Sequence, residues 1–516
     1  MKVRAAFVFF VFFVYAVAAN VPFWIASRSM GLLLTGVFNF DLAVVGMLSV
    51  FLRRSVTVTL LAIVLVLDVL RGISSTYLLS PLEMIRSARY LFEYAPTHVG
   101  DIVAVMFLIG LICFMAAHAQ DNRATDRERV YVVSALAIFV VVVGTVDVHE
   151  RRTSLFHGDY ERSTLRLSRL PAHELAMSEV MFWHFIHLRS AGSKTLVPAA
   201  SKMMARFENA SVAAHANAMA PNVVLILVES WGKSLDAGLE RSLVLPYVDK
   251  NLFERYTMSE GTVPFYGPTV AGEARELCGS AMGFGLLSAT AAELNGCLPE
   301  NMHRKGYHST AVHGYHARMF DRGEWYRRIG FDESWFLDRL QQEGLPVCPG
   351  PFPGICDAAA SAWIGDRLQR DADSPQFVYW VTLNSHLPVP VPNDVKAPPS
   401  CSENAITAES TAICSWYQLV FNVHRSVSEL ALRPTKRPTI FLIVGDHTPP
   451  FSSMQLKSHF SNQAVPYVLL MPKREGAADG AETQRSVASA ARSPAGERRS
   501  PPKKETTRTS SAVGGG

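Results

Sequence analysis

The stretch NVVLILVES, residues 222–230, is a short run of β-branched and aliphatic residues that ends on a carboxylate, Glu229. Two later stretches have the same form: FVYWVTLNSH ends on His386, and TIFLIVGDH ends on Asp446 and His447. Each pattern predicts a buried strand whose first polar residues lie at its C-terminal end. In an open parallel α/β sheet, ligands and catalytic groups gather at that edge.

A carboxylate, an Asp-His pair and a further histidine at one sheet edge would suit a hard or borderline divalent cation. A single strand that ends in Glu or His is common and usually has no such meaning. Three of them in one chain are much rarer. The sequence therefore predicts a metal site at this edge of an α/β domain.

Apolar residues are concentrated in the first part of this 516-residue chain, which is long enough for several domains. Five stretches there approach the ~20 apolar residues needed to cross a bilayer. We therefore expect a transmembrane domain of five helices over residues 1–148. The predicted spans are residues 5–25, 31–52, 56–72, 102–119 and 130–148.

Basic residues between the spans predict the orientation of this anchor. Lys2 and Arg4 precede the first span, Arg53 and Arg54 follow the second, and further arginines follow the fourth. All of these positions fall on one side, which we take as cytoplasmic. An odd number of spans then places everything after residue 148 outside the cytoplasm.

Three segments follow the predicted anchor. Residues 149–220 have the pattern of a helical linker, and residues 221–473 alternate strands, helices and turns as in a globular α/β domain. Residues 474–516 are rich in Ala, Ser, Arg, Gly and Pro without apolar periodicity, so we expect disorder there. The net charge of +4 is too small to indicate nucleic-acid binding.

Six of the seven cysteines lie in the globular part, in three pairs that are close in sequence. The spacing suggests the disulfides Cys278–Cys297, Cys348–Cys356 and Cys401–Cys414, although six cysteines allow fifteen pairings. Such bridges would require an oxidising compartment, in agreement with the predicted orientation. A metal–thiolate cluster is disfavoured because no C-x-x-C spacing occurs.

A candidate nucleophile follows the first strand. The stretch GPTVAGEARELCGSA contains a Gly-Pro turn and then a helical pattern, so Thr269 would stand at a helix start, where free N–H groups favour negative charge. A threonine hydroxyl becomes a good nucleophile when a bound dication stabilises its alkoxide. Thr269 could instead simply cap the helix. Thr262 and Ser280 are nearby alternatives for the nucleophile.

Taken in order, these motifs resemble the membrane-anchored, sulfatase-like branch of the alkaline phosphatase superfamily. That branch includes lipoteichoic acid synthases, phosphoglycerol transferases and lipid A phosphoethanolamine transferases. The resemblance covers residues 220–473 and implies a central, mostly parallel sheet flanked by helices. The motifs that carry it are NVVLILVESWG at 222–232, GPTVAGEARE at 267–276, GFD at 330–332, TLNSHLP at 382–388 and VGDH at 444–447.

The resemblance also implies roles for residues at the predicted metal site. Glu229, Asp446 and His447 would hold a catalytic divalent cation, Zn²⁺ or Mn²⁺. Thr269 would be the fourth ligand and the nucleophile. His386 would contact the head group of the substrate.

Three further positions extend the resemblance. Arg322, in the stretch MFDRGEW, matches an arginine near the phosphate in phosphoglycerol-transferring members. Phe320 stands where those members often have Trp, which leaves head-group recognition open. His459 could join a second metal site, as in the phosphoethanolamine enzymes.

The implied activity is metal-dependent transfer of a phosphoglycerol or phosphoethanolamine head group from a phospholipid donor, through a phosphothreonine, to an envelope glycan or a lipid A type acceptor. The implied location is a bacterial inner membrane, with the catalytic domain periplasmic. One alternative is a metal-dependent phosphodiesterase or sulfatase-like hydrolase, and another is a non-catalytic scaffold for envelope assembly. True sulfatases use a modified Cys or Ser within C-x-P-x-R, whereas Cys278 is followed by GSAM.

Overall fold

The computed structural model describes most of the anchor and of the globular domain. The described residues are 4–32, 36–77, 79, 84, 90, 99–120, 124–156, 197–212, 219–265, 267–280, 282–370, 373–387, 389, 398–452 and 454–473. The tail predicted to be disordered, and the part of the predicted linker between residues 157 and 196, lie outside these ranges.

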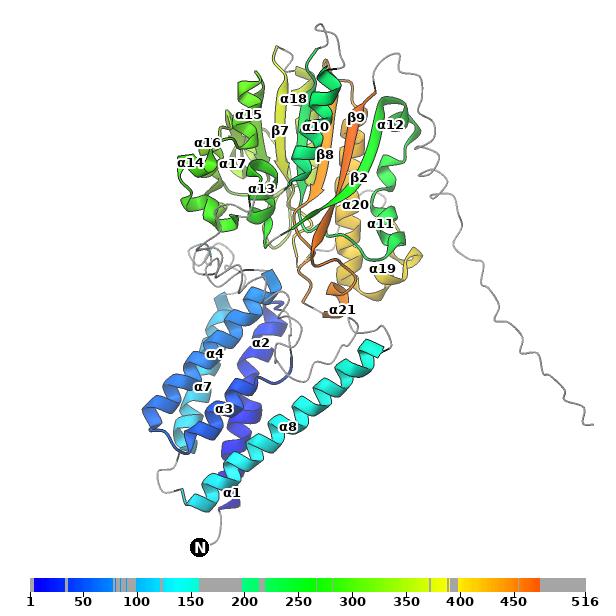
Figure 1. Cartoon of the computed structure of the whole chain (residues 1–516). Coiled ribbons are helices and arrows are strands. Elements are labelled where there is room, and N and C mark those ends of the chain that lie inside the picture. Colours follow the sequence, from blue (N-terminus) through cyan, green and yellow to red (C-terminus); the bar gives the residue numbers. More distant parts are fainter. Residues whose placement is uncertain are drawn as a thin grey trace, which may run out of the picture. The chain divides into compact units, whose positions relative to one another are not determined.

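Four helical segments of the N-terminal part are long and apolar enough to cross a membrane: Ala5–Ser29, Arg54–Ser74, Gly100–Ala119 and Asp126–His149. They match four of the five predicted spans. The helices of this part, drawn in blue and cyan in Figure 1, are α1 (Ala5–Phe12), α2 (Val21–Ser29), α3 (Phe40–Ser49), α4 (Arg54–Tyr77), α7 (Val99–Ala119) and α8 (Asp126–Phe156). Between α1 and α2 the helix continues through a π-helical turn and a 3₁₀ turn.

The second predicted span, residues 31–52, is not a full-length helix. Its helix α3 has only 10 residues, which is about 15 Å and half the thickness of a bilayer core. Gly31 follows α2 with a positive φ of 64°, and the Asn39 side chain accepts a hydrogen bond from the backbone N–H of Asp41 to cap α3. The prediction failed because uniform apolar composition concealed a break and a late helix start.

The C-terminus of the short helix α3 nevertheless lies at the same end of the helix bundle as residue 4, the first described residue. Arg4 forms an ion pair with Glu128 at the start of α8, and Gln120, just after α7, donates to the carbonyls of Ser49 and Leu52. The segment between α2 and α4 therefore returns to the starting end, and α8 leads away from it. This arrangement, with the disulfides described below, is consistent with a membrane protein whose globular domain lies outside the cytoplasm.

The globular domain is built on a seven-stranded sheet with the order β2-β9-β8-β1-β7-β3-β4. Strands β8, β1, β7, β3 and β4 run parallel, and β9 is antiparallel to both β8 and β2. The sheet is thus mixed but mostly parallel, as expected. Its strands are β1 (Asn222–Val228), β2 (Tyr256–Pro264), β3 (His308–His313), β4 (Glu333–Trp335), β7 (Gln376–Val381), β8 (Thr439–Gly445) and β9 (Ala464–Pro472).

The register of the three central strands brings their C-terminal ends level. Val228 of β1 is opposite Gly445 of β8, and Leu227 is opposite Val381 of β7. The polar residues that follow these strands must therefore meet at one edge of the sheet. This is the position that the sequence predicted for the site.

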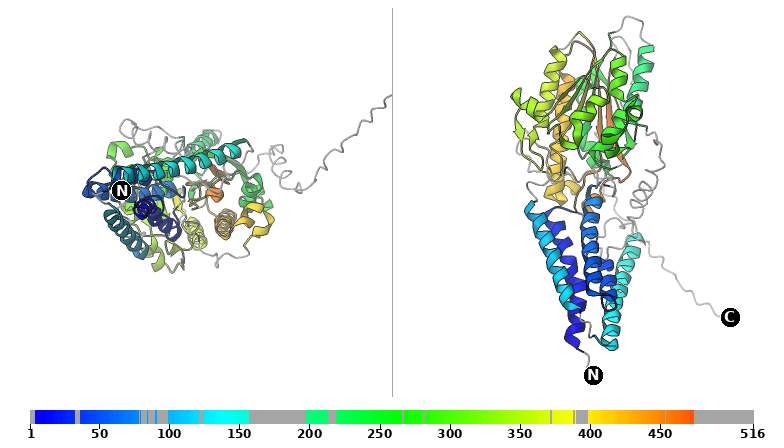
Figure 2. Two further views of the ribbon diagram at one scale, coloured as in Figure 1. Left: turned by 90° about the horizontal axis from the view of Figure 1, so that it is seen from below. Right: turned by 90° about the vertical axis from the view of Figure 1, so that its left-hand side faces the viewer.

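Helices cover both faces of the sheet (Figures 1 and 2). The central strands β1, β7 and β8 are buried on both sides, which explains their continuous apolar runs. One face packs against α10 (Ala199–Val212), α13 (Thr269–Cys278), α15 (Leu298–Arg304) and α16 (Arg322–Arg328). The other packs against α11 (Ala237–Leu243), α12 (Lys250–Arg255), α17 (Leu337–Gln342), α18 (Asp357–Arg370) and α20 (Thr411–Leu432).

Helix α10 comes from the predicted linker but is part of the globular core. Ala199, Ala200 and Met203 are buried among the residues of the first face. The shorter helices of the domain are α14 (Ala291–Leu294), α19 (Ala405–Glu409) and α21 (Met454–Lys457).

Three disulfides brace the edges of the domain, in the three pairs that the sequence spacing suggested. Cys278–Cys297 joins the end of α13 to the start of α15, and Cys348–Cys356 closes a small hairpin of β5 (Val347–Cys348) and β6 (Gly354–Ile355). Cys401–Cys414 ties a 3₁₀ turn to α20. Each bridge would contribute about 2–4 kcal/mol by restricting the unfolded chain.

His424 on α20 makes the stability of this fold sensitive to acid. Its ring is buried, has Nδ1 in a hydrogen bond of 3.0 Å with the Tyr247 hydroxyl and packs edge-on against Trp231. Burial lowers the pKa of His424 to about 3, whereas the unfolded chain takes up this proton near pH 6.5. Stability is therefore complete above about pH 6.5 and is lost as the pH falls toward 3, by at most ~1.4 kcal/mol per pH unit.

We expect His424→Gln, which keeps a neutral polar side chain, to flatten the decrease in melting temperature between pH 7 and pH 4. Thermal unfolding of the full chain in detergent measures this slope. His303→Gln replaces a largely exposed histidine that pairs with Asp332 and should change the slope much less, because solvent screens that pair. An unchanged slope in His424→Gln would assign the acid sensitivity to other groups.

Candidate metal centre and nucleophile

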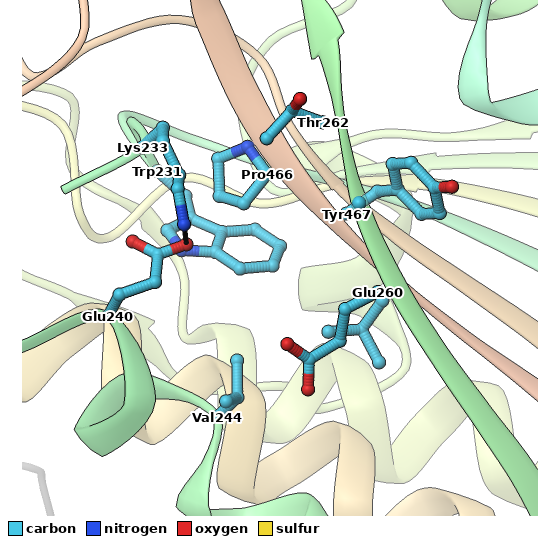
Figure 3. A pocket seen from close by; sticks show the side chains of 10 residues that line it. Trp231, Lys233, Glu240, Val244, Glu260, Thr262, Pro466 and Tyr467 are labelled. Carbon is cyan, nitrogen blue, oxygen red and sulfur yellow. Dashed lines mark ion pairs between the residues drawn. The ribbon is translucent and has the colours of Figure 1, made fainter. Parts of the chain in front are cut away.

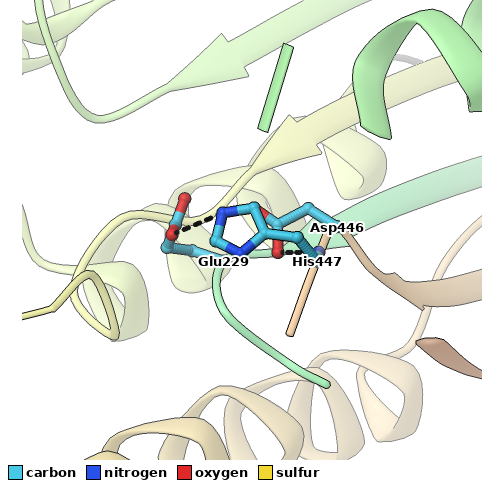
Figure 4. A group of neighbouring side chains, drawn as sticks. All are labelled: Glu229, Asp446 and His447. Atoms are coloured by element: carbon cyan, nitrogen blue, oxygen red, sulfur yellow. Dashed lines mark hydrogen bonds and ion pairs between the residues drawn. The ribbon is translucent and has the colours of Figure 1, made fainter. Parts of the chain in front are cut away.

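Two of the three predicted strand ends place metal-type ligands in one buried cluster (Figure 4). Glu229, Asp446 and His447 are all buried, and one ligand atom from each lies within 4.8 Å of the others. His447 Nε2 lies 3.3 Å from Asp446 Oδ2 and 3.5 Å from Glu229 Oε1. We call these three residues the acidic cage.

Hydrogen bonds around the acidic cage fix where its lone pairs point. His447 Nδ1 lies 2.8 Å from the carbonyl oxygen of Thr448, which can only accept, so Nδ1 carries the proton and Nε2 of the neutral ring carries a lone pair. Asp446 Oδ1 accepts from the backbone N–H groups of Ser230 and His447. Asp446 Oδ2 is buried and has no hydrogen-bond partner among the described residues.

Two carboxylates and an imidazole lone pair therefore converge on one point, where Asp446 Oδ2 lacks a hydrogen-bond donor from the described part of the chain. This donor set fits a divalent cation such as Zn²⁺ or Mn²⁺. The titration of the cage agrees with that fit. Burial and the charge of Glu229 raise the pKa of Asp446 to about 8, and burial opposes protonation of His447, but Asp446 and Glu229 raise its pKa. A raised pKa is the response expected of a buried carboxylate that shares a site with a second negative charge.

Thr269 adds a hydroxyl to the acidic cage. It is the first residue of α13, and its Oγ1 donates to Glu229 Oε2 at 3.0 Å and lies 3.5 Å from His447 Nε2. The residue in the capping position is Pro268, and no side chain caps this helix. The Thr269 hydroxyl therefore serves the cage and is not a helix cap.

The two alternative nucleophiles have other environments. Thr262 lies on the edge strand β2 and is exposed. The Ser280 hydroxyl accepts a hydrogen bond from the backbone N–H of Met282. Neither has a described contact with the cage.

Close backbone packing holds the cage together. A Cβ atom on Gly445 would lie 1.9 Å from the carbonyl oxygen of Trp231, and one on Gly272 would lie 3.1 Å from the Cα atom of Asp446. Ser230 adopts a left-handed φ of 57° and donates its hydroxyl to Glu229. A non-glycine residue in that region costs about 1–3 kcal/mol, which the bonds around Ser230 offset.

Helix α13 also fixes the end of β8, beside Asp446. The sequence did not predict this contact. Buried Arg275 donates to the carbonyls of Gly445 and Asp446 at 2.7 and 3.2 Å, and to Glu276 at 2.6 Å. Glu276 in turn accepts from the backbone N–H of Ala200, near the start of α10. Helix α13 packs on the core and yet contains three charged residues, Glu273, Arg275 and Glu276. This pattern in the sequence could have indicated that its charged side chains hold other elements in place.

His386 follows β7 and lies beside the cage. Its Nδ1 lies 2.8 Å from the Leu387 carbonyl, so Nδ1 donates and Nε2 carries the lone pair. Burial lowers the pKa of His386 and the charge of Glu229 opposes the shift, which leaves the ring neutral. Phe352, in the loop closed by the Cys348–Cys356 disulfide, packs edge-on against the ring at 4.6 Å.

Arg322 belongs to a buried ion pair. It is 2 % exposed, and its guanidinium donates to Glu273 of α13 through Nε and Nη2 at 2.9 and 2.7 Å. Glu273 lies one helical turn after Thr269, so both residues share one face of α13. Sequence reasoning did not single out Glu273, although its spacing from Thr269 could have indicated it.

His459 lies apart from the acidic cage. Its Nε2 pairs with Glu409 Oε2 at 2.9 Å, and the described residues offer no third metal-type side chain beside them. A second metal at His459 thus stays a prediction without a described ligand set. Among the described residues, His313 lies beside Arg322.

A separate cavity of about 190 Å³ lies between strands β2 and β9 and helix α11 (Figure 3). Its walls include Trp231, Glu260 and the Lys233–Glu240 ion pair. It shares no residue with the acidic cage, so we do not assign the chemistry to it.

Comparison with known proteins identifies a family for the globular part. The family model "Sulfatase" matches residues 221–492, which is more than half of the chain. No curated protein matches the sequence.

Three solved structures illustrate how distant the known folds are. The lipoteichoic acid synthase LtaP from Listeria monocytogenes is 14 % identical with a TM-score of 0.37, over 50 % of this chain and 66 % of that one. The phosphoglycerol transferase GacH from Streptococcus pyogenes, in complex with sn-glycerol-1-phosphate, is 13 % identical with a TM-score of 0.34, over 52 % and 73 %. The periplasmic domain of EcEptC from Escherichia coli, in complex with Zn, is 13 % identical with a TM-score of 0.31, over 52 % and 75 %. The chain thus spans slightly less than two thirds of the LtaP chain.

We expect Glu229→Gln to weaken metal binding by at least about tenfold, because the amide removes one charge and one ligand oxygen from the cage. Metal content after dialysis of the purified full chain, measured by elemental mass spectrometry, checks this. Glu240→Gln removes a carboxylate from the separate cavity and serves as the matched control. Equal metal content in Glu229→Gln and the wild type would contradict the proposed ligand.

Proposed function

The chain belongs to the sulfatase family, and from this premise we propose that it transfers the phosphorylated head group of a phospholipid to an acceptor in the cell envelope. The transfer would pass through a phosphothreonine at Thr269. The observation that carries this proposal is the Thr269 hydroxyl, 3.0 Å from Glu229 inside a buried Glu/Asp/His cage.

The choice of nucleophile favours a phosphoryl substrate over a sulfate ester. Cys278 lacks the Pro and Arg of the sulfatase signature and is bonded to Cys297. It therefore offers no thiol for the modification on which true sulfatases depend. Thr269 offers a hydroxyl that contacts both Glu229 and His447 of the cage.

The reaction would proceed in two balanced steps. A divalent cation held by Glu229, Asp446 and His447 would, when bound, lower the pKa of the Thr269 hydroxyl and offset charge on the phosphate. The Thr269 oxygen forms a bond to phosphorus, the bond from phosphorus to the diacylglycerol oxygen breaks, and that oxygen takes the threonine proton. An acceptor hydroxyl then attacks the phosphorus, the bond from phosphorus to the Thr269 oxygen breaks, that oxygen regains a proton from the acceptor, and the phosphorylated head group leaves on the acceptor.

Two residues beside the cage support these steps. His386 is neutral with its Nε2 lone pair free of the backbone bond, so it can take the proton of the acceptor hydroxyl. Arg322 keeps N–H groups that could bind the phosphate oxygens. Phe352 against His386 would form part of the wall around the head group.

The four candidate membrane spans support a lipid donor, because they would hold the domain at a membrane surface. Diacylglycerol would then leave directly into the bilayer. We propose a bacterial inner membrane with the domain on the periplasmic side. Phosphoglycerol and phosphoethanolamine both suit the site as head groups, and a glycan or lipid A as acceptor.

We expect Thr269→Ala to reduce transfer by more than ~10³-fold while the protein stays folded, because among the described residues the Thr269 hydroxyl is the one in contact with both Glu229 and His447. Intact-mass measurement of the wild type incubated with phospholipid should show one head-group adduct, absent from Thr269→Ala. Thr262→Ala, which removes an exposed hydroxyl of β2, should keep both adduct and turnover.

Retained turnover in Thr269→Ala would exclude this mechanism. A second measurement separates transfer from hydrolysis. If the wild type releases only free head group when a purified envelope glycan is present, the protein is a phosphodiesterase and not a transferase.

A further inference from the structure

Arg322 and Glu273 form a neutral unit in the interior of the domain. Glu273 is fully buried, and its Oε1 accepts both Nε and Nη2 of Arg322. Its Oε2 accepts from the hydroxyls of Tyr326 and, at 3.5 Å, Tyr379. Burial and the nearby Glu273 raise the pKa of both tyrosines well above the ordinary value, so both hydroxyls stay protonated. The carboxylate therefore cancels the positive charge of Arg322.

The remaining edge of Arg322 is held by His313. Arg322 Nη1 lies 3.3 Å from His313 Nε2, and His313 Nδ1 lies 3.1 Å from the carbonyl of Val381. The guanidinium can only donate and the carbonyl can only accept, so His313 is a neutral ring protonated on Nδ1. These bonds use three of the five N–H groups of an arginine and leave one N–H on each Nη atom.

Arg322 lies at the sheet edge that carries the cage. His313 and Val381, the chain of contacts that reaches Arg322, are the last residues of β3 and β7, and Glu273 stands one turn from Thr269 on α13. Phe320 and Asp321, directly before Arg322, have left-handed φ values of 55° and 49°. Such backbone costs about 1–3 kcal/mol per residue and persists where surrounding contacts fix it. The chain is thus held in strained backbone directly before Arg322.

From this geometry we infer that Glu273 is the positioning residue that sets the charge preference of the phosphate subsite, which rests on the proposed function. With its charge cancelled, Arg322 offers N–H donors but no net positive charge. A singly charged phosphodiester needs only the donors, whereas the second charge of a phosphomonoester finds no compensation and faces the Glu273 carboxylate. Glu273 therefore favours phosphodiesters over phosphomonoesters at this site.

The test compares two esters on the full chain in detergent at about pH 8, where a phosphomonoester is dianionic. Bis(4-nitrophenyl) phosphate is the singly charged probe and 4-nitrophenyl phosphate the doubly charged one. Glu273→Gln keeps the shape and one acceptor oxygen but removes the charge. We expect the ratio of kcat/KM for diester over monoester to fall by about tenfold or more, mainly through a lower KM for the monoester.

Three variants separate charge from packing. Glu276→Gln removes the other buried carboxylate of α13, which pairs with Arg275, and should change both esters in the same proportion. Arg322→Gln leaves Glu273 uncompensated and should raise the ratio above the wild type. The double variant Glu273→Gln with Arg322→Gln is neutral again, is milder than removal of one partner, and should bring the ratio back toward the wild type.

A binding measurement makes the test independent of turnover. In a Thr269→Ala background, calorimetric titration should show that Glu273→Gln tightens binding of inorganic phosphate by about tenfold and leaves dimethyl phosphate unchanged. Equal effects on both anions and both esters would assign Glu273 a purely structural role and overturn the inference.

The other possible results distinguish failure of the proposed transfer reaction from failure of the charge preference assigned to Glu273. A wild type that turns over neither ester and forms no adduct at Thr269 contradicts the proposed function, while the phosphate titration still tests the charge preference. A wild type with adduct and turnover, but with the same ratio in Glu273→Gln, contradicts the inference alone. Should Glu273→Gln fail to fold, an Arg322→Gln ratio at or below that of the wild type overturns the inference.

Discussion

The site depends on one helix, α13, whose charged side chains are buried in the interior of the domain. Nine of the ten residues of α13 are buried, including Glu273, Arg275 and Glu276. A buried charge is costly unless it is paired and hydrogen-bonded, and each of these three has its partner on a different element. Glu273 holds α16, Arg275 holds the end of β8, and Glu276 holds the start of α10. The helix cannot shift without leaving one of them unpaired, and so the position of Thr269 at its first turn is fixed.

The opposite side of the acidic cage is fixed by strand register and backbone contact. The level ends of β1 and β8 bring Glu229 beside Asp446, and the carbonyl of Trp231 fits against Gly445 only because that residue has no side chain. The cage thus lies between a sheet edge that is set by main-chain hydrogen bonds and a helix that is set by ion pairs. Neither part alone would hold a cation and a hydroxyl within bonding distance.

The sequence could predict the parts of this arrangement that depend on short, contiguous stretches of residues. Apolar runs that end on Glu229, His386 and Asp446 indicate strands of a parallel sheet, and their ends must meet at one edge. The three disulfides could be proposed from spacing because each closes a loop of fewer than twenty residues. The resemblance to known motifs supplied the roles that spacing alone does not give.

Other features depend on contacts that no local pattern records. Glu273 and Arg322 are 49 positions apart, and periodicity shows which face of a helix is buried but not what it meets there. The stretch 31–52 is apolar throughout most of its length, and only Gly31 and Asn39 mark where helix is interrupted. His459 is paired with Glu409 from a distant helix, which alignment of a short motif could not reveal.

The bond between Glu276 and Ala200 has a consequence for where the domain begins as a folding unit. The family match starts at residue 221, yet Ala199, Ala200 and Met203 of α10 fill the core beside β8 and α13. A shortened protein that started at the family boundary would expose that apolar face to water and leave the Glu276 carboxylate buried without its backbone donor. The autonomous domain therefore extends upstream to about residue 197, and the chain that tethers it to the bilayer is shorter than the motifs suggest.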